Sequence, residues 1–262
     1  SLEAILKLVF FGMFLLMGWQ VLGAVGAMLL SVIAAGIFTY FSLRSYLQNP
    51  TKISPDIEGF FKYSLIALLQ GLALTAMYST DLLLVKHYFN AEQAGVYASL
   101  AILGRVVFFG ITPIAQVMFP IVVRRHADNQ PYRLLFLGCL GIVSLMVIIL
   151  VGLDSTLPAF IISLLYGQAF SSGASILWWF ALTLGMLGVS NLFIQFYLSI
   201  GKTKIVGLFV LAAILQIVLI LLYHQTLLQV IQMSAISCAL LLLGLLLYFP
   251  YHNRNEKLTT IK

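Results

Sequence analysis

Charged residues are scarce in this 262-residue sequence, since Asp, Glu, Lys and Arg together make up only 8% of it. A soluble domain carries roughly 25% charged residues. Hydrophobic residues make up 62% of the chain, which leaves too few charged side chains to cover a water-facing surface. The composition argues against a soluble enzyme, a nucleic-acid binder and a disordered regulator. It predicts an all-α, polytopic membrane protein with membrane lipids as its surroundings.

Motifs for metal, cofactor and nucleotide chemistry are also missing. The two cysteines, Cys139 and Cys238, lie far apart in apolar runs, and no group of residues has metal-ligand spacing. The sequence contains neither a phosphate-binding G-x-x-x-x-G-K-[ST] loop nor an H-E-x-x-H motif. We therefore predict no metal site, no cofactor and no ATP site in this chain.

Long apolar runs dominate what is present. A helix needs about 20 apolar residues to cross the hydrocarbon core. Eight runs are candidates, of which the first is short. The apolar run 157–166 is too short to span, and we expect it to lie at the interface or to re-enter the membrane. The eight candidates are 4–19, 21–43, 60–85, 93–123, 134–153, 174–199, 205–223 and 226–249.

The positions of Lys and Arg give an orientation for these runs. If the C-terminus is cytoplasmic and the runs alternate, only Lys86 falls in an outer loop and only Arg105 falls in mid-span. Such segregation agrees with the positive-inside rule and predicts a multi-pass protein with a cytoplasmic C-terminus. The basic residues placed inside are Lys7, Arg44, Lys52, Lys62, Arg124, Arg125, Arg133, Lys202, Lys204, Arg254, Lys257 and Lys262.

Two charges lie inside the apolar runs. Arg105 is near the middle of the fourth run, and Asp81 is about one helical turn from the outer end of the third. A charge at mid-bilayer costs at least about 2.5–3.5 kcal/mol, so it is expected to face a partner or a water-filled cavity. Asp81 could instead pair with Lys86 or His87 in a structural role, and a direct bridge between Asp81 and Arg105 looks strained because their depths differ.

Polar side chains align with these charges at helical spacing. At about 100° per residue, one stripe on the fourth run and one on the third each contain a charged residue, and a weaker stripe lies on the sixth. Three polar stripes on separate helices are what a shared aqueous lumen needs, but amides can also simply bond neighbouring helices. The predicted lumen residues are Arg105, Thr112, Gln116, Asp81, Gln70, Asn191 and Gln195.

Two prolines interrupt the fourth run. Pro113 and Pro120 each remove a backbone hydrogen bond and can bend the helix. They are hinge candidates, although prolines in membrane helices also serve packing alone.

The stretch 80–125 resembles the seventh and eighth helices of the Wzx-like O-antigen and polysaccharide flippases, members of the MATE-like (MOP) exporter superfamily. The resemblance rests on Asp81, on the E-x-x-G-x-Y pattern of Glu92, Gly95 and Tyr97, and on Pro113 and Pro120 before a basic pair. A second match is carried by Leu164, Tyr166, Gly167 and Phe170, and a third by Gly201 and Lys202. The whole pattern covers roughly residues 44–205.

This resemblance implies a two-lobe transporter of twelve to fourteen helices, of which the chain would be a C-terminal fragment. Residues 1–48 would hold the last two helices of the first lobe, 49–250 the six-helix second lobe, and 251–262 a cytoplasmic tail. The implied cargo is an undecaprenyl-diphosphate-linked oligosaccharide, moved from the inner to the outer leaflet of a bacterial inner membrane by alternating access. Coupling to H+ or Na+ and contacts with polysaccharide-assembly proteins are further expectations.

A lipid II flippase for peptidoglycan, with the same mechanism but a different glycan, is another reading, and two further functions remain open at this stage. One is an ion-coupled antiporter for small molecules or drugs in the same superfamily, which would favour acidic rather than basic lumen residues. The other is a membrane-embedded glycan polymerase or ligase, which usually carries catalytic residues on a large outer loop. The expected outer segment 86–92 is tiny, and 154–173 has one acid. We therefore expect a transporter and not an enzyme, with Arg105 as the contact for diphosphate or acidic sugar.

Overall fold

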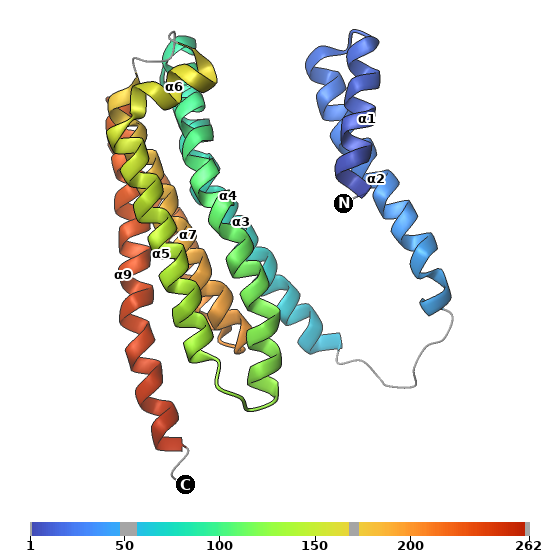
Figure 1. Cartoon of the computed structure of the whole chain (residues 1–262), viewed down its shortest axis with the longest axis vertical. Coiled ribbons are helices and arrows are strands. Elements are labelled where there is room, and N and C mark those ends of the chain that lie inside the picture. Colours follow the sequence, from blue (N-terminus) through green and yellow to red (C-terminus); the bar gives the residue numbers. More distant parts are fainter. Residues whose placement is uncertain (1, 48–56, 168–172, 260–262) are drawn as a thin grey trace. The chain divides into compact units, whose positions relative to one another are not determined.

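The computed structural model describes residues 2–47, 57–167 and 173–259, and within them every regular element is a helix (Figure 1). This confirms the predicted all-α class. The elements in order are α1 (Leu2–Leu16), α2 (Gln20–Leu47), α3 (Ile57–Tyr88), α4 (Ala91–Ala127), α5 (Arg133–Thr156), α6 (Pro158–Tyr166), α7 (Leu177–Ser199), the 3-10 turn η2 (Thr203–Ile205), α8 (Val206–Leu222) and α9 (Leu227–Thr259).

Seven of the described helices are long and apolar enough to cross a membrane. They correspond to the second through eighth predicted spans. The first predicted span, 4–19, forms α1, whose 15 residues at about 1.5 Å each do not match a hydrocarbon core about 30 Å thick. Within the run 157–166, Pro158–Tyr166 form the 9-residue helix α6, which is too short to span, as predicted.

The chain divides into two compact units, Ser1–Asp56 and Ile57–Lys262. The predicted boundary between residues 48 and 49 lies outside the described residues. Residues 251–259 of the predicted tail continue α9 as helix. The assignment of the units to two transporter lobes stays a prediction.

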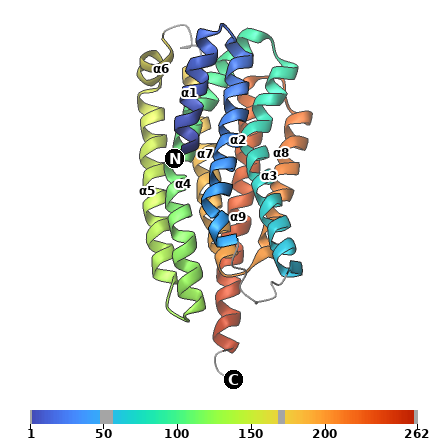
Figure 2. The same ribbon diagram turned by 90° about the vertical axis from the view of Figure 1, so that its right-hand side faces the viewer.

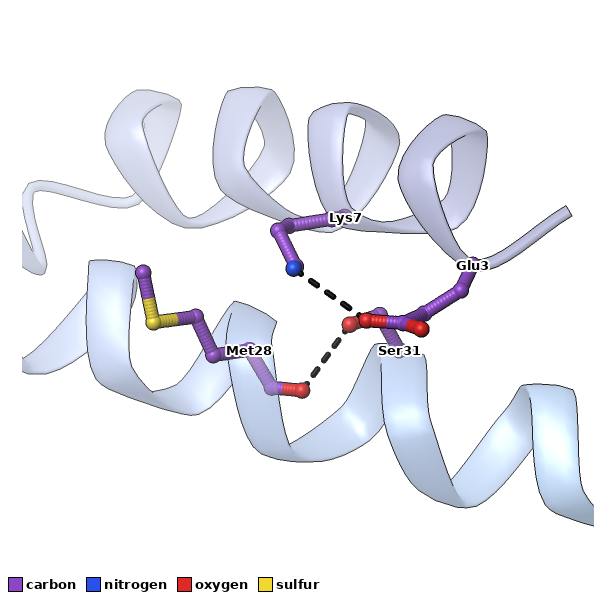
Figure 3. A network of polar contacts seen from close by, with 4 residues as sticks. All are labelled: Glu3, Lys7, Met28 and Ser31. Atoms are coloured by element: carbon purple, nitrogen blue, oxygen red, sulfur yellow. Dashed lines mark hydrogen bonds and ion pairs between the residues drawn. The ribbon is translucent and has the colours of Figure 1, made fainter. Parts of the chain in front are cut away.

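The first unit is a pair of helices, α1 and α2, joined by a tight turn at Gly18. Gly18 adopts φ 77°, a left-handed conformation that suits glycine. The Phe14 and Trp19 rings stack at 5.5 Å across this turn. Within α1, Lys7 forms an ion pair with Glu3 at 3.2 Å, and Ser31 of α2 donates to the Met28 carbonyl at 2.8 Å (Figure 3).

The second unit is built around α7. This helix contacts α4, α5 and α9, while α8 packs against α3 and α9 (Figure 2). Two-thirds of the apolar window of α7 is buried, against 11% for that of α5. Helix α7 is therefore the core of the unit, and α5 exposes apolar side chains such as Ile148 along most of its length.

The two ends of the second unit differ in their connections. The turn between α3 and α4 and the short helix α6 lie at one end, and the loop between α4 and α5 lies at the other (Figure 1). Pro158 starts α6, where its missing N–H needs no partner, and Gly167 ends it at φ 81°. We call these the α6 end and the α5-loop end.

Candidate functional site

The predicted charges lie on α3 and α4, which form an antiparallel pair. Only Phe89 and Asn90 separate the two helices. Asn90 caps α4, because its side-chain oxygen accepts a hydrogen bond from the backbone N–H of Gln93 at 2.8 Å. This short connection brings residues near the end of α3 against residues near the start of α4.

Asp81 is buried in this pair and is paired with Tyr97. The Tyr97 hydroxyl donates to one carboxyl oxygen at 2.8 Å, and the backbone N–H of Leu82 donates to the other at 2.8 Å. Tyr97 is fully buried and its ring packs edge-on against Phe180 of α7 at 4.8 Å. Asp81 therefore joins α3 to α4, and no ion pair within 4.0 Å joins it to Lys86 or His87, all of which the structure describes.

Arg105 of α4 reaches across to α3 one turn before Asp81. Its Nη2 donates to the Tyr78 carbonyl at 2.9 Å, and its guanidinium lies 5.7 Å from the centre of the Tyr78 ring. This is a cation–π contact at the outer limit of the usual range. The buried Nε has no hydrogen-bond partner among the described residues. No ion pair within 4.0 Å joins Arg105 to Asp81 in the described part of the chain.

The rest of the α4 stripe follows Arg105 along the helix without contacting it directly. Thr112 is half-buried and donates to the Phe108 carbonyl at 2.7 Å, whereas Gln116 is exposed. Pro113 and Pro120 are exposed on the same helix, which continues unbroken from Ala91 to Ala127. Their role as hinges stays a prediction.

Gln70 lies on the buried face of α3, which it shares with Met77 and Asp81. Only 7% of Gln70 is exposed, and its Nε2 has no partner among the described residues. Buried amides in such positions are usually satisfied by water. The structure thus places the α3 stripe inside the second unit rather than on its surface.

Sequence reasoning missed the best-connected amide of the unit, Gln216 of α8. Its Nε2 donates to the Met77 carbonyl at 3.1 Å and to the Ser234 hydroxyl at 3.0 Å. One side chain therefore bridges α8 to α3 and α9. The available signal was a single amide in the otherwise apolar 17 residues of α8.

Asn191 and Gln195 lie on the central helix α7. Asn191 is 2% exposed with its Oδ1 unpaired, and Gln195 is half-buried. Because α7 is enclosed by α4, α5 and α9, Asn191 is an interior residue of the second unit. The structure brings Asp81 and Arg105 to one helix pair, but it makes no direct contact between them and the α7 amides. Lining of a shared lumen by all seven residues stays a prediction.

The described residues include no group of three His, Cys, Asp or Glu side chains able to hold a metal. The chemistry available at the α3–α4 pair is therefore that of one guanidinium, one carboxyl, one phenol and nearby amides. These groups recognise charged and hydroxyl-rich molecules by hydrogen bonding.

Comparison with known proteins identifies the family of the chain. A family described as polysaccharide biosynthesis protein matches residues 3–175, which include α1 to α6. No curated protein and no solved structure matches the chain. The match confirms the resemblance carried by the motifs in 80–125, and seven apolar helices make the protein multi-pass. The chain belongs to the polysaccharide biosynthesis protein family of membrane proteins.

Proposed function

We propose that the protein translocates an undecaprenyl-diphosphate-linked oligosaccharide from the inner to the outer leaflet of a bacterial inner membrane. Membership of the polysaccharide biosynthesis family supports a transporter in this process. The proposed mechanism is alternating access, in which two lobes open in turn to each side of the membrane. The C-terminus is proposed to be cytoplasmic, and coupling to H+ or Na+ and contact with polysaccharide-assembly proteins belong to the same proposal.

The proposal rests on the position of the Arg105 guanidinium and on its hydrogen-bond donors. A guanidinium has five N–H donors and stays charged, which suits it to phosphate oxygens. In the described structure one of these donors bonds the Tyr78 carbonyl, and Nε is without a partner. The side chain thus retains donors for an anion while its position is held by α3.

The surrounding side chains fit a path for sugars beside this cation. Thr112 and Gln116 continue the polar stripe of α4 toward the α5-loop end. We propose that these two residues bond sugar hydroxyls while the polyprenyl chain stays outside this polar path. Gln70, Asp81, Asn191 and Gln195 are proposed to support the path from inside the unit.

The first prediction tests Arg105 in a strain that lacks its own flippase. We expect the full-length protein to restore surface glycan, and Arg105→Ala to lower delivery at least tenfold. That loss corresponds to about 1.4 kcal/mol or more, which is within the range of charge-assisted hydrogen bonds. Surface glycan and inner-leaflet lipid-linked oligosaccharide are measured together, because a transport defect lowers the first and raises the second.

Matched variants separate binding from folding in this test. Arg105→Lys keeps the charge but loses the planar donor array, so delivery should be intermediate. Val106→Ala changes the exposed neighbour on the same helix and should deliver normally. Normal delivery by Arg105→Ala at equal protein level removes Arg105 from the site. Drug resistance without glycan delivery would favour the antiporter, and glycan polymerised by the purified protein would favour the enzyme.

A further inference from the structure

An apolar groove lies at the α6 end of the second unit, between the last turns of α3 and the first turns of α4. Its volume is about 520 Å³, and it is separate from the contacts of Arg105. All but one of its lining residues are apolar: Leu82, Leu83, Phe89, Ala91, Ala94 and Ala98, with Lys86 as the exception.

Lys86 is unusual in both sequence and structure. It is the one basic residue expected in an outer loop, against the positive-inside rule. It does not pair with Asp81, since no ion pair within 4.0 Å joins these two described side chains, and the Asp81 carboxyl accepts from Tyr97 and Leu82 instead. Lys86 is exposed and forms no ion pair in the part of the chain that the structure describes. The groove therefore carries an unpaired ammonium group.

The local field favours an anion beside this lysine. Helix α4 starts at Ala91 within the lining, and the positive end of its macrodipole points toward the groove. Glu92 in the first turn offsets part of that field, but Lys86 remains uncompensated by contact. A cation that lines an apolar groove, at the depth where a membrane helix ends, complements a lipid phosphate with its chain.

We propose that this groove holds the isoprenoid chain of the carrier lipid after translocation, with its phosphate against Lys86. The choice of an isoprenoid over an acyl chain rests on the proposed function and on the α4 side of the groove. Ala91, Ala94 and Ala98 follow at helical spacing and project no atom beyond Cβ, which leaves room for methyl branches.

The test is photo-crosslinking on the purified full-length protein in phosphatidylcholine nanodiscs. A benzophenone amino acid replaces Leu83 at the groove or, as control, Leu145 on the lipid-exposed helix α5. The probes are undecaprenyl phosphate and phosphatidylglycerol, and mass spectrometry identifies the crosslinked lipid. We expect undecaprenyl phosphate to be enriched at position 83 and not at position 145.

Variants of Lys86 and Ala94 test whether lipid binding depends on the charge and on the shape of the groove. Lys86→Gln should weaken apparent binding of undecaprenyl phosphate about fivefold, Lys86→Arg should preserve it, and the neighbouring His87→Gln should leave it unchanged. Ala94→Leu should remove the crosslink by filling the groove. Equal crosslinking of phosphatidylglycerol, or binding insensitive to Lys86, overturns the proposal.

The experiments distinguish failure of the groove proposal from failure of the proposed function. Crosslinking requires no transport, so occupancy of the groove is measured independently of glycan delivery. An empty groove in a protein that delivers glycan overturns the groove alone. A filled groove in a protein that does not restore surface glycan overturns the function.

Discussion

Asp81 and Tyr97 form a buried polar contact between α3 and α4. A carboxyl group in this interior needs a donor, and the phenol supplies one at 2.8 Å. Arg105 of α4 is held instead by the backbone carbonyl of Tyr78, which lies one turn before Asp81 on α3. The two charged side chains thus have separate partners, which leaves the guanidinium with donors to spare.

The second prediction concerns this contact. Tyr97→Phe keeps the ring but removes the donor to Asp81, so we expect a loss of about 1–2 kcal/mol in unfolding free energy. The measurement is the thermal stability of the detergent-solubilised protein. Tyr63→Phe, on an exposed part of α3, should have no effect.

A double-mutant cycle makes this prediction specific. Asp81→Asn combined with Tyr97→Phe should cost less than the sum of the single changes, because both remove the same contact. Additive losses would mean that the hydrogen bond contributes nothing to stability.

At the scale of elements, α4 and α7 form the most extensive helix pair of the second unit. Small residues permit their close approach. A Cβ at Gly104 would lie 2.8 Å from the Cβ of Phe180, and one at Gly188 would collide with the Ile111 side chain. Membrane helices use glycine in this way to bring backbones together. The position of Arg105, next to Gly104, therefore depends on this packing.

The third prediction tests the packing of α4 against α7 by substituting two glycines of α4. Gly104→Val should destabilise the protein by about 1–3 kcal/mol, because the added side chain overpacks the interface. Gly110→Val is the matched control, since beyond the chain neighbours and the local backbone of its own helix no atom lies within 4 Å of the Cβ position there. Solubilised yield and melting temperature report the difference. Equal effects at both positions would show that valine acts through the helix backbone rather than through packing.

At the scale of the molecule, basic residues of the second unit gather at its α5-loop end. Arg124 and Arg125 lie in the last turn of α4, Arg133 begins α5, and Lys204 lies in η2. Lys86 lies in the last turn of α3, at the α6 end. This separation by ends supports the proposed orientation, in which the α5-loop end faces the cytoplasm.

The fourth prediction tests that orientation by cysteine labelling in intact cells. Gln130→Cys, in the exposed loop between α4 and α5, should react with a membrane-impermeant maleimide only after the membrane is opened. Glu92→Cys, at the start of α4, should react from outside. The unsubstituted protein gives the background from Cys139 and Cys238, which lie within α5 and α9. The opposite pattern would invert the orientation.

The sequence by itself determined the fold class, seven of the eight predicted spans and the family resemblance. These depend on composition, run length and charge position, which do not require knowledge of distant contacts. It also indicated Arg105 and Asp81 as candidate functional residues, because a charge inside an apolar run is visible without a structure. Helix α1 ends at Leu16, before the end of the predicted span 4–19, because an apolar run does not fix where a helix ends.

The tertiary structure decided what those residues contact. The 16-residue separation of Asp81 and Tyr97 becomes a contact only through the tight turn at Asn90. The bridge from Gln216 to Met77 spans 139 residues, and no periodicity within one helix can indicate it. Periodicity gives the direction in which a side chain points on its own helix, whereas packing decides which helix lies there. For that reason helical spacing gives the relative directions of the α3 and α7 amides, but only the structure placed Gln70 and Asn191 in the interior.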